Sequence, residues 1–328
     1  MKKLRSLVWL VTARCNLSCT HCYAQRFRGQ RELDSGEALA LLIEAAGLGV
    51  GWLGLAGGEP LMRPDIRQII EKSQALGMSV GIVTNGDPVT EEMARFISEH
   101  QVSISVSLDG ARPETHDRRR GRGSFERAIG AICRLREAGA SYKPAMALGQ
   151  DNHAEVEDYV ELARRSGARA ACIIPVMPSG RAGIDNVLTP VQMSEALVRA
   201  ARKADSVGIE LQPWCTPFAP LVVPSLEGSA GSCRSSHSMD IDPGGNALLC
   251  DVLDIAISSV RDGGLASAWK KHCESDTVQR LEDPYLPQVC ATCRLARRCR
   301  GGCFARAYLV SGDLYAPDPL CPRVAGIL

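Results

Sequence analysis

Three cysteines close to the N-terminus stand in the string CNLSCTHC, which has the spacing CxxxCxxC. They are Cys15, Cys19 and Cys22. Thiolates at these intervals reach only three of the four irons of a cubane 4Fe-4S cluster, so one iron stays open for a ligand that is not protein. A structural zinc site is the alternative, but such sites close with four ligands and favour paired CxxC spacing. The spacing therefore predicts a loop that binds an iron-sulfur cluster.

The cysteine string follows an apolar run, Leu7 to Val11, that predicts a first β-strand. The cluster would then lie at the C-terminal end of a strand, where α/β barrels carry their active sites. Segments with the apolar periodicity of a strand alternate along the chain with segments that have the periodicity of a helix, and this alternation predicts a parallel sheet. Strands are expected near residues 52–56, 80–84, 102–108, 143–148 and 170–176. Helices are expected after Asp34 and Ser35, from Pro64 to Gly77, and at residues 90–99, 124–138, 155–166 and 190–207. The fold class predicted is α/β, a partial (βα)6 barrel followed by a small, irregular iron-sulfur domain.

Four further strings follow the cysteines in an order that resembles the radical S-adenosylmethionine (SAM) enzymes. They are Gly57-Gly58-Glu59-Pro60, Thr84-Asn85-Gly86, Ser107-Leu108-Asp109-Gly110, and His116 to Gly121, which matches HDxxRG. The first three end predicted strands. In that family the amino and carboxylate groups of SAM chelate the open iron, and reductive cleavage of SAM gives a 5'-deoxyadenosyl radical.

The resemblance implies a set of SAM-binding residues. His21 would lie against the adenine, and Arg120 would hold the carboxylate, because a planar guanidinium binds a carboxylate at two points. Arg118 and Arg119 are expected to be solvated. The implied SAM contacts are His21, Gly57, Gly58, Glu59, Pro60, Asn85, Ser107, Asp109 and Arg120.

A second group of cysteines fills the C-terminal region and resembles the SPASM domain, which carries two auxiliary 4Fe-4S clusters. Carried over by position, auxiliary cluster II would be held by Cys290, Cys293, Cys299 and Cys321. Auxiliary cluster I would be held by Cys233, Cys250 and Cys303, which leaves it one ligand short. Cys215, His237 or an exchangeable ligand could complete it. The resemblance thus implies SAM and three 4Fe-4S clusters as cofactors.

Composition limits where such a chain works and what it binds. The chain has 14 cysteines in 328 residues, and thiolate clusters need a reducing compartment, so a cytoplasmic location is expected. A net charge of +1 favours neither nucleic acid nor a membrane as a partner. The predicted domains are residues 1–208 for the barrel, 209–232 for a bridge rich in Pro, Gly and Ser, and 233–328 for the SPASM domain.

The resemblance also implies a reaction. A hydrogen atom is taken from the substrate, the auxiliary clusters could accept an electron, and Asp251, next to Cys250, matches the position of a proton-accepting aspartate in sulfatase-maturing relatives. The substrate expected is a peptide or protein residue, and the alternative is the side chain of a tetrapyrrole in heme or heme d1 biosynthesis. Flavodoxin or ferredoxin would be the reductant. Since the barrel begins at once, a separate protein could supply peptide recognition. A zinc-stabilised binding module is the remote alternative.

Overall fold

The computed structural model describes residues 2–228, 231–233 and 237–328. Its strands form one ten-stranded sheet in the order β10-β9-β8-β1-β2-β3-β4-β5-β6-β7. They are β1 (Ser6–Thr12), β2 (Trp52–Gly57), β3 (Ser79–Thr84), β4 (Ser103–Ser107), β5 (Tyr142–Leu148), β6 (Ala170–Pro175), β7 (Glu210–Pro213), β8 (Ser238–Ile241), β9 (Asn246–Leu248) and β10 (Ala256–Ser259). Strands β1 to β7 run parallel, and β8 is parallel to β1.

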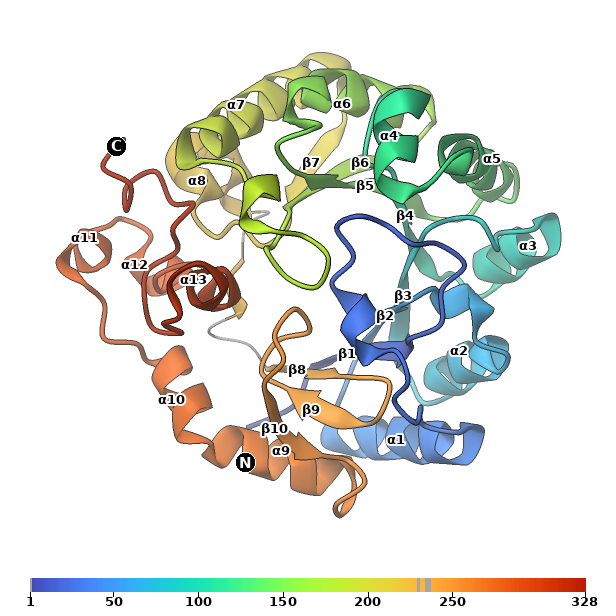
Figure 1. The fold of residues 1–328 in the computed structure, drawn as a ribbon. Coiled ribbons are helices and arrows are strands. Elements are labelled where there is room, and N and C mark those ends of the chain that lie inside the picture. Colours follow the sequence, from blue (N-terminus) through green and yellow to red (C-terminus); the bar gives the residue numbers. More distant parts are fainter. Residues whose placement is uncertain (1, 229–230, 234–236) are drawn as a thin grey trace.

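Helices cover the outer face of the curved sheet, as Figure 1 shows in a view along the barrel. They are α1 (Ser35–Leu48), α2 (Ile66–Ala75), α3 (Glu91–Glu99), α4 (Pro113–Arg120), α5 (Ser124–Glu137), α6 (Val156–Arg165) and α7 (Pro190–Val207). The C-terminal part adds α8 (Ala219–Val222), α9 (Gly264–Glu274), α10 (Asp276–Glu282), α11 (Gln288–Ala291), α12 (Ala296–Cys299) and α13 (Phe304–Ser311). Each of β1 to β6 leads into a helix before the next strand, so the predicted partial (βα)6 barrel is confirmed.

Local sequence explains the helix boundaries. Asp34 and Glu37 form a capping box at the start of α1, which satisfies backbone N–H groups that the first turn leaves free. Gly49 ends α1 and Gly208 ends α7 in the left-handed conformation that glycine adopts without a steric penalty. The predicted helices and strands of the barrel are all present, with ends that differ by a few residues.

The main core lies between the sheet and its helices. On β4, Ile104 and Val106 are fully buried in this core, against helix residues such as Ala128 and Ala131 of α5. Ser105 and Ser107 alternate with them and therefore face the barrel interior. The alternation read from the sequence thus separates the helix side of the sheet from the side that faces the interior.

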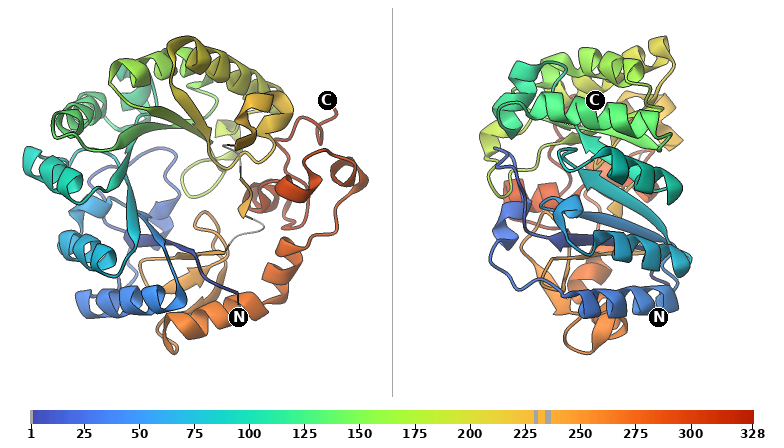
Figure 2. Two further views of the ribbon diagram at one scale, coloured as in Figure 1. Left: turned by 180° about the vertical axis from the view of Figure 1, so that it is seen from behind. Right: turned by 90° about the vertical axis from the view of Figure 1, so that its right-hand side faces the viewer.

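The C-terminal part is more regular than the sequence indicated. β7 lies within the segment predicted as a bridge, and β8 to β10 extend the sheet beyond β1. In Figure 1 the cysteine-rich helices α11 to α13 fill the gap between β7 and the β8–β10 side, and Figure 2 shows the same arrangement from behind. The predicted boundaries at residues 208 and 232 stay predictions. No described helix combines the length and apolar character needed to cross a membrane.

Candidate functional site

The three motif cysteines lie on the loop that follows β1, as predicted. The backbone N–H of Cys22 donates to the Cys19 carbonyl at 3.4 Å, and the N–H of Leu17 donates to the Cys15 sulfur at 3.4 Å. Burial raises the pKa of Cys15 and Cys19, and the neighbouring charge of Cys22 raises both further. The thiols are thus near neighbours in a place where positive iron would stabilise their thiolate forms.

Two glycines hold this loop against the end of β2. The N–H of Gly58 donates to the Thr12 carbonyl at 2.7 Å, and the N–H of Glu59 donates to the Arg14 carbonyl at 2.8 Å. A Cβ on Gly57 would lie 2.4 Å from the Thr12 oxygen, and a Cβ on Gly58 would lie 2.1 Å from the Arg14 oxygen. Only glycine therefore allows the backbone of the cysteine loop to approach this closely.

Gly58→Ala is expected to displace the start of the cysteine loop and to prevent binding of the iron-sulfur cluster predicted there, because the new methyl group overlaps a carbonyl that cannot rotate away. Iron and sulfide analysis of the anaerobically reconstituted protein measures this loss. Gly51→Ala is the matched control, since a Cβ there meets nothing within 4 Å. Full iron content in the Gly58→Ala variant would contradict this role for Gly58.

Glu59 is fully buried, and its carboxylate is already engaged by the protein. It accepts hydrogen bonds from the Thr84 hydroxyl at 2.7 Å, the Asn85 N–H at 2.7 Å and the Leu61 N–H at 3.1 Å. Burial raises its pKa to about 7 despite these bonds. Pro60 begins the short helix Pro60–Met62 that follows. The Glu59 side chain therefore ties the end of β2 to the end of β3.

Asn85 links β3 to the cysteine loop. Its amide donates to the Asn16 side-chain oxygen at 2.8 Å and lies 3.9 Å from the Cys15 sulfur. Ser107, buried at the end of β4, leads to Asp109. The predicted SAM-binding residues at the ends of β2, β3 and β4 thus lie along one edge of the sheet, next to the cysteine loop.

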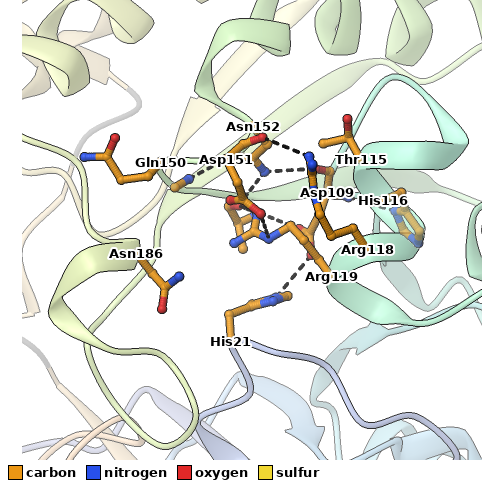
Figure 3. Close-up of polar contacts among 12 residues, drawn as sticks. His21, Asp109, Thr115, His116, Arg118, Arg119, Gln150, Asp151, Asn152 and Asn186 are labelled. Atoms are coloured by element: carbon orange, nitrogen blue, oxygen red, sulfur yellow. Dashed lines mark hydrogen bonds and ion pairs between the residues drawn. The ribbon is translucent and has the colours of Figure 1, made fainter.

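Asp109 is the centre of a buried charged group that includes two other predicted SAM contacts. Its Oδ2 is 2.6 Å from Nε of Arg120 on α4 and 3.1 Å from Nε2 of His21. Burial alone would raise the pKa of Asp109, but the charges of Arg120 and His21 hold it well below its usual range. Figure 3 shows His21 pointing from the cysteine loop toward Asp109.

His21 also carries an unused polar atom. Its Nδ1 is buried and has no hydrogen-bond partner among the described residues. A buried polar group without a partner is costly, so it indicates that something else is bound beside it. This atom lies in the group implied for SAM, and the residues present therefore fit that cofactor.

The HDxxRG string lies on α4, a helix that the sequence did not predict, and its Gly121 caps the C-terminal end. His116 accepts from the Asp109 N–H at 3.0 Å through Nδ1, and burial lowers its pKa to about 4, so the ring stays neutral and can accept. Arg118 is exposed as expected, but the expectation that Arg119 is solvated is wrong, since Arg119 is 2% exposed. Its guanidinium donates to the Ala147 carbonyl inside the barrel.

Asn152 and Arg181 are contacts that sequence analysis missed. Asn152, buried on the loop after β5, donates to the carbonyls of Asp109 and Ala147 at 2.8 and 2.9 Å (Figure 3). Arg181, on the loop after β6, donates from its backbone to the Cys22 carbonyl at 3.1 Å and from its guanidinium to the Cys19 carbonyl at 3.3 Å. Neither residue stands in a string with recognisable spacing.

The four cysteines predicted for auxiliary cluster II line a single cavity with the apolar side chains of Leu221, Val289 and Val324. Burial raises the pKa of Cys299 to about 12, and the charges of the other three cysteines contribute. The structure therefore brings together Cys290, Cys293, Cys299 and Cys321.

The spacing of the sulfur atoms argues against single zinc ions. A tetrahedral zinc ion with bonds of about 2.3 Å holds its sulfurs about 3.8 Å apart. Across the residues that the structure describes, no three cysteine sulfurs lie within 4.8 Å of one another. One mixed group, Asp240, Cys250 and Asp251, does bring its ligand atoms within 4.8 Å, so the spacing argues only against zinc sites made of cysteines alone.

Asp251 connects the cysteine loop with the C-terminal cysteines. Its Oδ2 accepts from the Tyr23 hydroxyl at 2.7 Å, and its backbone N–H donates to Asp240 Oδ2 at 2.8 Å. Tyr23 is adjacent to Cys22, and Asp251 is adjacent to Cys250. Burial and the charge of Asp251 raise the pKa of Asp240 to about 8. Asp251 is thus a half-buried carboxylate between the two cysteine regions.

Comparison with known proteins agrees with this arrangement. Residues 9–163 match the family model described as the Radical SAM superfamily. The mycofactocin maturase MftC of Mycobacterium tuberculosis is 31% identical over 325 residues, covering 96% of this chain and 82% of MftC. The AdoMet-dependent heme synthase of Methanosarcina barkeri is 29% identical over 338 residues, covering 97% of this chain and 96% of that protein.

The fold is shared with solved structures as well. The structure of Streptococcus suis SuiB bound to SAM superposes with a TM-score of 0.78 at 17% identity, covering 96% of this chain and 76% of SuiB. SuiB has also been solved with its precursor peptide SuiA, at the same TM-score of 0.78. At this level of identity the match shows the fold.

Proposed function

From the premise that this chain belongs to the radical SAM superfamily and is an enzyme that performs radical chemistry, we propose that it oxidatively modifies a residue of a peptide or protein. The enzyme uses SAM and an iron-sulfur cluster. When bound, these cofactors supply a radical that removes a hydrogen atom from an unactivated C–H bond. We propose that Cys15, Cys19 and Cys22 hold this cluster, and that SAM lies among His21, Gly57, Gly58, Glu59, Pro60, Asn85, Ser107, Asp109 and Arg120.

The hydrogen bond between Tyr23 and Asp251 is the observation that carries the oxidative part of this proposal. A two-electron oxidation takes from the substrate a hydrogen atom, one electron and one proton. The proton needs a base close to the place where the electron leaves. Asp251 lies between Cys22 and Cys250, so its Oδ atoms are placed to accept that proton.

The remaining cysteines are proposed to hold two auxiliary clusters that take the electron. Cys290, Cys293, Cys299 and Cys321 would bind one, and Cys233, Cys250 and Cys303 would bind the other. The cavity that Cys290, Cys293, Cys299 and Cys321 share supports the first of these assignments. Flavodoxin or ferredoxin is proposed as the reductant, and a separate protein as the peptide-recognition partner.

The peptide substrate is supported by the maturase relative, which is 31% identical to this chain. The heme synthase relative favours a second candidate, oxidation or decarboxylation of tetrapyrrole side chains, because its match covers 96% of its own length. A deuterium assay distinguishes the two candidates, because only the true substrate transfers its deuterium label to 5'-deoxyadenosine. Short peptides encoded beside the gene are one set of probes, and a propionate-bearing tetrapyrrole is the other.

The reconstituted protein is expected to contain about twelve irons and as many sulfides per chain, because three 4Fe-4S clusters require them. Anaerobic metal and sulfide analysis with Mössbauer spectroscopy makes the measurement. A content of about eight irons per chain would support only one auxiliary cluster beside the cluster that binds SAM. Stoichiometric zinc with little iron would instead support the binding module and overturn the proposed function.

A further inference from the structure

Among the described residues, strand pairing does not close the barrel. The sheet ends at β7 on one side and at β10 on the other, and each end strand pairs with one neighbour in the described part of the chain. The C-terminal helices occupy the opening between these ends (Figure 1). Any group bound by side chains from both sides of the opening would therefore act as a cross-link.

Two of the cysteines assigned to auxiliary cluster I come from the β8–β9 side of this opening, and the third comes from the C-terminal helices that occupy it. Cys233 precedes β8, Cys250 follows β9, and Cys303 is the N-cap of α13. Cys215 comes from the other side, two residues after the end of β7. Four segments that are distant in the sequence thus each bring one cysteine to the same region.

Burial raises the pKa of all four thiols, and the charges of neighbouring groups change these pKa values further. Burial raises the pKa of Cys215 well above its usual value, and the charges of Cys303 and Cys233 raise it further. Cys233 is exposed as a residue, but burial of its thiol and then the charge of Cys303 raise its pKa to about 12. Cys303 acts in the same direction on Cys250, after burial and the nearby carboxylates. Cys303 thus raises the pKa of each of the other three thiols.

The backbone of Cys215 has a conformation that few residues with a side chain adopt. Its φ is +53°, in the left-handed region, which is uncommon for a residue other than glycine. The turn directly follows β7, where the Trp214 N–H still pairs with the Ile173 carbonyl at 2.8 Å. A glycine would make the same turn without this strain.

A buried ion pair fixes Cys215 and Cys303 together. Arg306 is fully buried, and its Nη2 donates to the Cys215 carbonyl at 2.9 Å and to Asp318 Oδ2 at 2.6 Å. The Arg306 backbone N–H donates to the Cys303 sulfur at 3.4 Å, and the Cys303 N–H donates to Asp318 Oδ2 at 3.0 Å. Burying an ion pair costs desolvation energy, and here it orients two cysteines from different segments.

His237, the other candidate ligand, makes different contacts. Its Nδ1 lies 3.1 Å from the Lys3 carbonyl oxygen, and its own carbonyl accepts from the N–H groups of Arg5 and Ser6. The residue is exposed and lines a cavity of about 810 Å³ with Lys2 and Glu282. These contacts belong to the N-terminal end of β1, and none of them involves one of the four cysteines.

We propose that Cys215 is the fourth protein ligand of auxiliary cluster I, so that this cluster cross-links the β7 end of the barrel to its β8–β9 side. The inference rests on the proposed presence of that cluster. With four thiolates the cluster has no open iron, so it would exchange electrons with the substrate but would not bind it. Assembly needs all four thiols as thiolates, and binding therefore releases their protons.

The proposal is tested with ¹³C-cyanide as a probe for open iron, read by hyperfine coupling in the reduced protein. The protein carrying Cys15→Ala, Cys19→Ala and Cys22→Ala lacks the cluster that binds SAM, so any open iron must belong to an auxiliary cluster. We expect no ¹³C coupling in this protein. Adding Cys215→Ala should create one cyanide-binding iron per chain or convert that cluster to a three-iron form.

Two controls and a measurement without substitutions complete the test. Cys172→Ala replaces another buried cysteine, and His237→Ala removes the competing ligand, and neither should create an open iron. In the unsubstituted protein saturated with SAM, cyanide should find no open iron. Coupling in that protein, or the same coupling with and without Cys215→Ala, would overturn the ligand assignment. Absence of all auxiliary iron would instead overturn the proposed function.

Discussion

Replacing Cys15, Cys19 and Cys22 together with alanine is expected to abolish formation of 5'-deoxyadenosine from SAM. Without these thiolates no cluster with an open iron can form on the loop after β1, and SAM has no site at which to receive an electron. About eight of the irons should remain, because the auxiliary cysteines lie in separate segments. Product analysis under anaerobic conditions with dithionite measures the first result, and Mössbauer spectroscopy measures the second.

The matched control for this triple variant is Cys133→Ala, Cys172→Ala and Cys273→Ala. It also removes three cysteines, but these residues stand on α5, β6 and α9, away from the motif strings. The control should retain SAM cleavage and all of its iron. If the motif variant still cleaves SAM while the control does not, the motif assignment is wrong.

Asp251→Asn is expected to uncouple hydrogen abstraction from product formation. The amide keeps the shape of the side chain and can still accept a hydrogen bond from the Tyr23 hydroxyl, but it cannot take a proton. General-base catalysis typically contributes about a hundred to ten thousand fold to the rate. The ratio of product to 5'-deoxyadenosine should therefore decrease by a factor in this range. Single-turnover experiments measure the ratio after cluster content has been checked.

Asp254→Asn is the control, because Asp254 is an exposed carboxylate three positions along the same segment. Tyr23→Phe tests the contact itself and should produce a smaller fall in the ratio, since the base remains but loses one partner. An unchanged ratio in Asp251→Asn would show that Asp251 is a structural acid and that a different group takes the proton.

The barrel itself could be predicted because its signals are local. On β4, Ile104 and Val106 alternate with serines. The sequence of this one strand therefore shows which residues face the core and which face the barrel interior. Gly57 and Gly58 were recognisable from their string, although only the structure shows that a Cβ would meet the carbonyls of the cysteine loop. The helix α4 was missed because its arginines and its low apolar content are typical of an exposed loop.

The amino-acid sequence by itself determined the alternation of strands and helices, the cysteine spacings and the family, since each depends on residues that are close in the chain. Only the tertiary structure decided which distant residues meet. Tyr23 reaches Asp251, Arg119 turns into the barrel, and Arg306 contacts both the Cys215 carbonyl and the Cys303 sulfur. The physical reason is that these contacts depend on the curvature of the sheet, which brings the strand ends and their loops together, and no local spacing records that curvature.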